Sequence, residues 1–145
     1  MAAARILIVD DDVILLDVLG RTLRRQGYDV LLACHPREAL TIVRQQAPID
    51  VVLSDIMMPE MQGTELVREI AQISPQTAPL LMTAGPAQVT DGIAVLRKPV
   101  SIQVLTSAVQ AALEQSAQLR DDFASPAQMQ RSKSGTPLGP PIHYS

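Results

Sequence analysis

Acidic, hydroxyl and ammonium side chains stand directly after four of the apolar runs in this sequence. In chain order, these side chains belong to Asp10, Asp11, Asp12, Asp55, Thr83 and Lys98. Carboxylates gathered in one cleft repel one another, so either some of them bind protons or a cation lies among them. Oxygen ligands without histidine or cysteine favour Mg²⁺ over zinc. The pattern predicts a magnesium site prepared for a phosphoryl group, which a carboxylate can accept as an acyl phosphate.

Thr83 and Lys98 add a hydroxyl and an ammonium group to the predicted site. Phosphoryl transfer depends mainly on the positioning of the reacting groups and on the neutralisation of their charge. A hydroxyl group and a compact cation both serve this purpose. Arg97 would not replace Lys98, because a planar guanidinium fork and an ammonium group fill different spaces.

The apolar runs are short and solid, which is typical of strands buried on both faces of a parallel sheet. We expect strands at residues 6–9, 28–33, 51–53, 80–82 and 93–96. Segments with helical spacing of apolar residues alternate with them, which predicts an α/β fold with a doubly wound, five-stranded parallel sheet. The expected strand order is the flavodoxin-like 2-1-3-4-5, in which ligands bind at the carboxyl ends of the strands. The aspartates after the first and third strands should therefore converge.

Helix starts are marked by residues that cap them. Asp12 is predicted to be the N-cap or a first-turn acid of the first helix, with a third metal ligand as the alternative. Ser101 is predicted to be the N-cap of the last helix, while His35 is either an N-cap or a solvated loop residue. The fourth helix should be shortened, because residues 84–97 leave little room and include two glycines and a proline.

Composition limits the classes of protein to which this chain can belong. The 145 residues are 47% hydrophobic and carry a net charge of -3, which gives no support for a nucleic acid or membrane partner. The only cysteine is Cys34, and no apolar run is long enough to span a membrane, so a cytoplasmic location is expected. We expect one domain over residues 1–117 and a flexible tail or linker rich in Pro, Ser and Gln over residues 118–145, although a short helix around residues 119–123 could extend the last helix.

Four motifs, at residues 6–12, 50–63, 81–84 and 98–99, together resemble those of response-regulator receiver domains of two-component signalling. Each motif is weak alone, but their order and spacing are specific, and the resemblance covers roughly residues 4–116. It implies a phosphorelay protein that is not an enzyme and takes a phosphoryl group from a sensor histidine kinase or a histidine phosphotransfer protein. The downstream partner would be another protein. The sequence leaves open whether the chain also forms a homodimer.

The resemblance implies a role for each site residue. Asp55 is the phosphoacceptor. Asp11 binds Mg²⁺ directly, Asp10 does so mainly through water, and the backbone carbonyl of Met57 is a further ligand beside Asp55. Thr83 donates a hydrogen bond to the phosphoryl group. Lys98 pairs with that group, and the bond from Lys98 to the proline after it is typically cis.

The sequence departs from the family pattern at Val95, where the family usually has an aromatic residue, and in the short segment before it. These departures put in doubt the usual output through the fourth helix and fifth strand. They motivate one alternative, a pseudo-receiver that binds proteins without regulatory phosphorylation. A second alternative rests on Asp10 and Asp12, which also resemble the opening of haloacid-dehalogenase-type phosphohydrolases. The short chain and the lack of an acidic pair after Lys98 oppose it.

Overall fold

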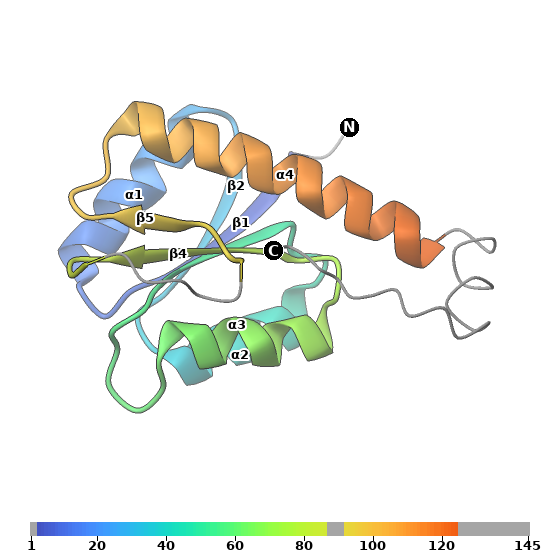
Figure 1. The fold of residues 1–145 in the computed structure, drawn as a ribbon, viewed down its shortest axis with the longest axis horizontal. Coiled ribbons are helices and arrows are strands. Elements are labelled where there is room, and N and C mark those ends of the chain that lie inside the picture. The colour runs from blue at the N-terminus through green and yellow to red at the C-terminus, as the bar shows by residue number, and fades with distance from the viewer. Residues whose placement is uncertain (1–2, 87–91, 125–145) are drawn as a thin grey trace.

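The computed structural model describes residues 3–86 and 92–124. Strands and helices alternate along most of the chain (Figure 1). Their bounds are β1 Arg5–Val9, α1 Val13–Arg25, β2 Asp29–Ala33, α2 Pro36–Gln46, β3 Val51–Asp55, α3 Gly63–Ile73, β4 Ala78–Thr83, β5 Val95–Arg97 and α4 Ile102–Ala124. Among the described helices, none is long and apolar enough to cross a membrane.

The five strands form one parallel sheet in the order β2-β1-β3-β4-β5, which confirms the predicted fold class. Strand order reverses between β1 and β3, where Val9 pairs with Ser54. The chain leaves β1 towards α1 on one face of the sheet and leaves β3 towards α3 on the other, so the loops after these strands diverge and leave a cleft. The residues that follow Val9 and Ser54 therefore border the same crevice.

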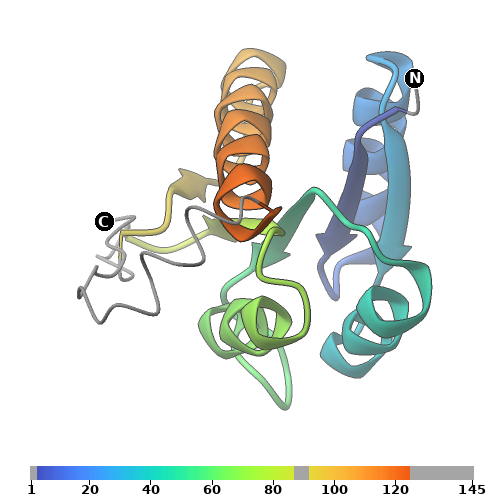
Figure 2. The same cartoon turned by 90° about the vertical axis from the view of Figure 1, so that its right-hand side faces the viewer.

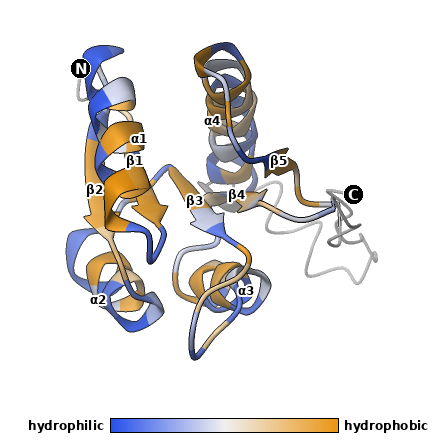
Figure 3. Cartoon of the chain, turned by 90° about the vertical axis from the view of Figure 1, so that its left-hand side faces the viewer, coloured by the Kyte–Doolittle hydropathy of each residue, from blue (hydrophilic) through white to orange (hydrophobic). Residues whose placement is uncertain are grey.

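Helices cover the sheet on both faces, with α1 and α4 on one side and α2 and α3 on the other (Figure 2). Two aliphatic clusters fill the space between the layers, and alternate residues along each strand enter opposite clusters. In β1, Ile6 and Ile8 face α1 and α4, whereas Leu7 and Val9 face α2 and α3. Figure 3 shows β1 and β2 as hydrophobic after their charged first residues, while the tip of β3 turns hydrophilic.

The predicted N-caps close the starts of three helices. The Asp12 carboxylate accepts from the amides of Ile14 and Leu15 at 3.1 and 3.2 Å. His35 Nδ1 accepts from the Arg37 amide, and the Ser101 hydroxyl oxygen accepts from the Val104 amide at 3.1 Å. These contacts satisfy amides that lack a partner within the helix.

The chain passes from β4 to β5 without a helix in the parts that are described, residues 84–86 and 92–94. The expected shortened helix could lie only in residues 87–91, outside the described part. The last helix, α4, runs to Ala124 and so passes the boundary expected at residue 117. Its extension is held by an ion pair between Arg120 and Asp50 and by the Ser116 hydroxyl, which donates to the Gln76 carbonyl at 2.8 Å.

Candidate functional site

Three aspartates converge at the carboxyl ends of β1 and β3, as the strand pattern predicted. One carboxylate oxygen from each of Asp10, Asp11 and Asp55 lies within 4.8 Å of the others. Asp10 and Asp55 are buried, whereas Asp11 is exposed. Three hard oxygen donors at this spacing, one of them open to solvent, fit a Mg²⁺ ion that keeps part of its water shell.

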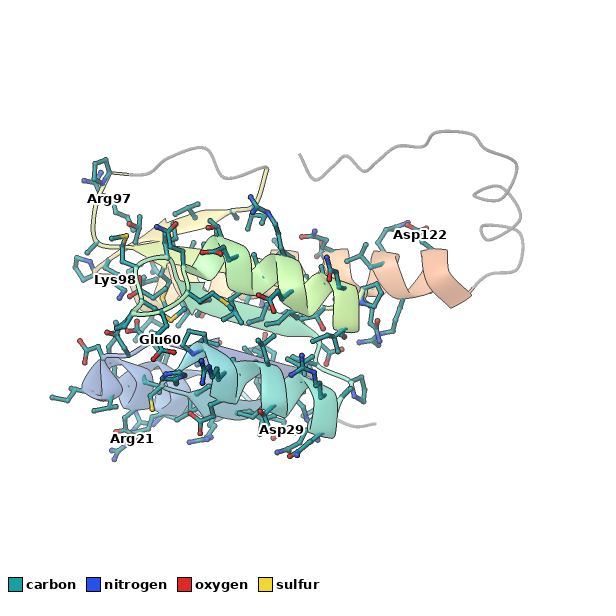
Figure 4. The ribbon with its side chains drawn as sticks, turned by 90° about the horizontal axis from the view of Figure 1, so that it is seen from below. Arg21, Asp29, Glu60, Arg97, Lys98 and Asp122 are labelled. Carbon is teal, nitrogen blue, oxygen red and sulfur yellow. The ribbon has the colours of Figure 1, made fainter. Side chains whose placement is uncertain are left out.

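Lys98 extends from the end of β5 into the acidic cluster. Its Nζ atom lies 2.9 Å from Asp10 Oδ2 and 3.2 Å from Asp55 Oδ2. Asp122 lies near the end of α4, and Figure 4 shows Lys98 at the opposite end of the described part of the molecule. Lys98 thus bridges two carboxylates, a pairing that the sequence motifs did not specify.

Both oxygens of Asp10 are engaged. Oδ1 accepts from the Asp12 amide at 2.9 Å, Oδ2 pairs with Lys98, and Asp10 has no exposed surface. A nucleophile must be open to an approaching substrate, and the Asp10 side chain is fully buried, whereas 9% of the Asp55 side chain is exposed. This geometry opposes the phosphohydrolase alternative, in which Asp10 would attack phosphorus.

Thr83 is the last residue of β4, beside the cluster, and a backbone hydrogen bond joins it to Lys98. The Lys98 amide donates to the Thr83 carbonyl at 2.8 Å, and the peptide bond from Lys98 to Pro99 is cis. The Thr83 hydroxyl oxygen accepts from the Gly85 amide at 3.1 Å. Because this contact uses a lone pair, the hydroxyl hydrogen remains available to a ligand.

The loop after β3 closes tightly over the end of the strand. The Met57 amide donates to Asp55 Oδ1 at 3.4 Å, and the Gly63 amide donates to the Ile56 carbonyl at 2.8 Å. A Cβ atom at Gly63 would lie 2.1 Å from the Asp55 carbonyl oxygen. Only glycine therefore allows α3 to begin against the residue that carries the central carboxylate.

Charge is unbalanced in the cluster, because one ammonium group faces two buried carboxylates. Burial raises the pKa of the Asp55 carboxyl; its hydrogen bond and charge interaction with Lys98 lower this pKa only in part, and the nearby Asp10 raises it further. For Lys98, burial favours a lower pKa, but the hydrogen bonds and charges of Asp10 and Asp55 outweigh it and raise the pKa. The cluster thus keeps the Lys98 ammonium group protonated, and its excess negative charge favours the binding of one more cation.

We expect Asp55→Asn to raise the free energy of unfolding of the metal-free protein at neutral pH. A carboxyl whose pKa is raised by folding favours its neutral form in the folded state, so its ionisation destabilises the fold above that pKa. The gain of Asp55→Asn over wild type should shrink as the pH falls through the raised pKa. Urea unfolding of both proteins across this range, with a chelator present, measures it. A gain that grows on acidification contradicts the prediction.

A second set of interacting polar side chains, which the sequence did not reveal, links the loop after β3 to the start of α2. His35 Nε2 lies 3.3 Å from Glu60 Oε1, and Arg37 Nε lies 3.9 Å from the same oxygen. Glu60 has a positive φ of 74°. In the sequence, Glu60 stands out only because it lies between a proline and a glycine in a short loop. That position does not indicate which residues Glu60 contacts.

A sequence model of the response regulator receiver domain matches residues 6–110. The chain belongs to this family. This membership is consistent with a part in two-component signalling, and the five-stranded fold with its acidic cluster agrees with it. The resemblance stated from the four motifs is thereby confirmed.

Curated relatives of this receiver domain are longer bacterial proteins. The transcriptional regulatory protein GlrR of Escherichia coli (strain K12) is 36% identical over 127 residues, a match that covers 82% of this chain and 28% of GlrR. The transcriptional regulatory protein ZraR of the same strain is 44% identical over 79 residues, or 54% of this chain and 18% of ZraR. This chain therefore spans about a quarter or less of the length of these relatives.

Solved structures agree with the family. A CheY-like response regulator receiver domain protein from Methanospirillum hungatei JF-1 has a TM-score of 0.74 and 28% identity, covering 81% of this chain and 98% of that one. The receiver domain of the hybrid histidine kinase CckA has a TM-score of 0.69 and 32% identity, covering 76% of this chain and 99% of that one. Receivers that share this fold thus include parts of kinases.

Proposed function

We propose that this receiver accepts one phosphoryl group on Asp55, with Mg²⁺ held by Asp10, Asp11, Asp55 and the backbone carbonyl of Met57. The observation that carries this proposal is the convergence of three carboxylates within 4.8 Å around Lys98. An acidic cluster with a resident cation and a favourable place for a second one suits an incoming phosphoryl group. Mg²⁺ would neutralise charge on the phosphoryl oxygens during transfer.

The chain's own groups divide the remaining work. An Asp55 oxygen forms the new bond to phosphorus, while the bond between phosphorus and the donor breaks and the donor keeps that electron pair. Lys98, already 3.2 Å from Asp55, neutralises a phosphoryl oxygen. The Thr83 hydroxyl donates to another, because its own oxygen is held by the Gly85 amide. These groups act by position and charge.

The proposed donor is a phosphohistidine on a sensor histidine kinase or a histidine phosphotransfer protein. The two curated relatives above carry names of transcriptional regulatory proteins, yet the match covers only 28% and 18% of their length. For this chain we propose output through a protein partner. Absence of a nucleic acid partner stays a prediction, and self-association stays open.

Phosphorylation is tested with acetyl phosphate and Mg²⁺ on the full chain. We expect mass spectrometry to show one added phosphoryl group on wild type and none on Asp55→Asn. Asp12→Asn is the matched control, because it removes the same charge close by while Asn retains the capping function of Asp12. Uptake by Asp55→Asn equal to that of wild type, or no uptake by wild type, overturns the proposal.

A further expected result is slow loss of the phosphoryl group without a partner. The positions from which a side chain could orient an attacking water are Met57, two residues after Asp55, and Gly85, two residues after Thr83. Met57 is 66% exposed but carries no polar group that could orient water, and Gly85 has no side chain. Following the phosphorylated protein over time after donor removal measures this, and a half-life of seconds contradicts it.

A further inference from the structure

An apolar groove lies on the α3 side of the sheet, away from the acidic cluster. It has a volume of about 490 Å³, and its walls come from α3, the loop into β4, the segment before β5 and the end of α4. Apolar lining residues are Val67, Ala71, Pro75, Pro79, Ile93 and Leu119. Apolar concavities of this kind mark places where another apolar segment packs.

The groove exists because the two faces of the neighbouring strands β4 and β5 are covered unequally. On one face α4 packs against β4, whereas on the other α3 is the last described helix before the β5 edge (Figure 2). A parallel crossover usually carries a helix that fills this place. Here the described parts of the crossover, residues 84–86 and 92–94, form no helix. Among the described residues, Pro79 and Ile93 line the groove on this face.

The chain beyond α4 starts beside this groove. Leu119 lines it, and α4 ends five residues later at Ala124, about 8 Å further along the helix axis. Residues 137–144 then read Pro-Leu-Gly-Pro-Pro-Ile-His-Tyr, in which six of eight residues are apolar or proline and none is acidic or basic apart from one histidine. The twelve residues 125–136 can extend about 40 Å, far enough to return to Leu119.

We propose that residues 137–144 pack in this groove, beside α3 on the face of β4 and β5 where the described residues form no further helix. Proline-rich segments lose little conformational entropy on binding, because their backbone is already restricted. A connection of twelve residues also keeps the segment near the groove at a high effective concentration. Leu138 and Ile142 supply the apolar side chains. A partner that uses the same groove must then displace the segment, independently of phosphorylation at Asp55.

Disulfide trapping in the full chain tests the proposal. In a Cys34→Ala background, Ala71→Cys places a thiol in the groove and Ile142→Cys places one in the segment. We expect an intramolecular disulfide between them to form about tenfold faster, or more, than in the control pair Gln46→Cys with Ile142→Cys. Gln46 is exposed at the end of α2 and does not line the groove, and it lies four residues before Asp50, which pairs with Arg120 near the end of α4, so an unbound segment can reach it as well.

Two further variants complete the test. Adding Leu138→Asp to the Ala71→Cys pair should slow trapping to the control rate, whereas adding Thr136→Asp, just outside the segment, should not. Equal trapping rates for the groove pair and the control pair overturn the proposal. So does trapping mainly between two chains, which would assign the groove to a second copy.

Discussion

Gly63→Ala should lower the free energy of unfolding by about 3 kcal/mol, the upper part of the range for overpacking a core. The new Cβ would lie 2.1 Å from the Asp55 carbonyl oxygen and 3.0 Å from the Ile56 Cα. Both atoms belong to the backbone, so no side chain can turn aside to relieve the contact. The start of α3 must move away from β3, which also shifts the carboxylate of Asp55.

The same substitution should slow phosphoryl uptake from acetyl phosphate by about a hundredfold, because a misplacement of about 1 Å has that effect on positioned reactions. Gly20→Ala is the matched control. A Cβ there would meet only the end of the Leu32 side chain at 3.1 Å, and alanine favours the helix. Urea unfolding and uptake rates of the two variants measure the difference. Wild-type behaviour of Gly63→Ala would contradict the close contact.

Lys98→Met should destabilise the metal-free protein by about 3 kcal/mol, the cost of leaving a buried charge without its partner. The variant keeps the aliphatic stem but leaves Asp10 and Asp55 together without the ammonium group that lies 2.9 and 3.2 Å from them. Mg²⁺ should therefore raise the melting temperature of the variant more than that of wild type. At a fixed concentration, a ligand that binds more tightly stabilises the folded state more, and the variant's cluster attracts cations more strongly.

Arg97→Met is the control for this experiment, because it removes the same charge from the adjacent, exposed position. Figure 4 shows Arg97 and Lys98 as separate side chains near the same end of the sheet. We expect Arg97→Met to change the free energy of unfolding by no more than about 0.5 kcal/mol. Melting curves with chelator and with saturating Mg²⁺ measure both variants. Equal Mg²⁺ responses of Lys98→Met and wild type would show that Lys98 does not share the cluster's charge.

The sequence predicted the elements that depend on local pattern. Solid apolar runs identified the strands, and alternation with helical segments identified the parallel sheet, since few connections satisfy both. The convergence of Asp10 and Asp55 followed from the topology alone, because parallel strands present their carboxyl ends at one edge. Asp12 and Ser101 were predictable as N-caps because capping is a matter of one residue and the amides just after it.

Contacts between distant segments were not predictable in this way. The pairing of Lys98 with both Asp10 and Asp55 depends on how far β5 advances past β4, which a motif does not encode. The ion pair between Arg120 and Asp50 joins residues 70 positions apart, and it orders a part of α4 that composition alone assigned to a tail. Such distances arise from packing, so a single sequence carries no local signal for them.

The ion pair between Arg120 and Asp50 has a mechanical consequence. α4 begins four residues after Lys98 and extends for about 35 Å, and Arg120 attaches its far part to the start of β3. The helix is thus attached to the sheet near both of its ends. While the attachment at Asp50 holds, a displacement of Lys98 cannot rotate the helix as a rigid body about its first turn. It must turn the helix about its own axis, slide it lengthwise, or break the attachment at Asp50.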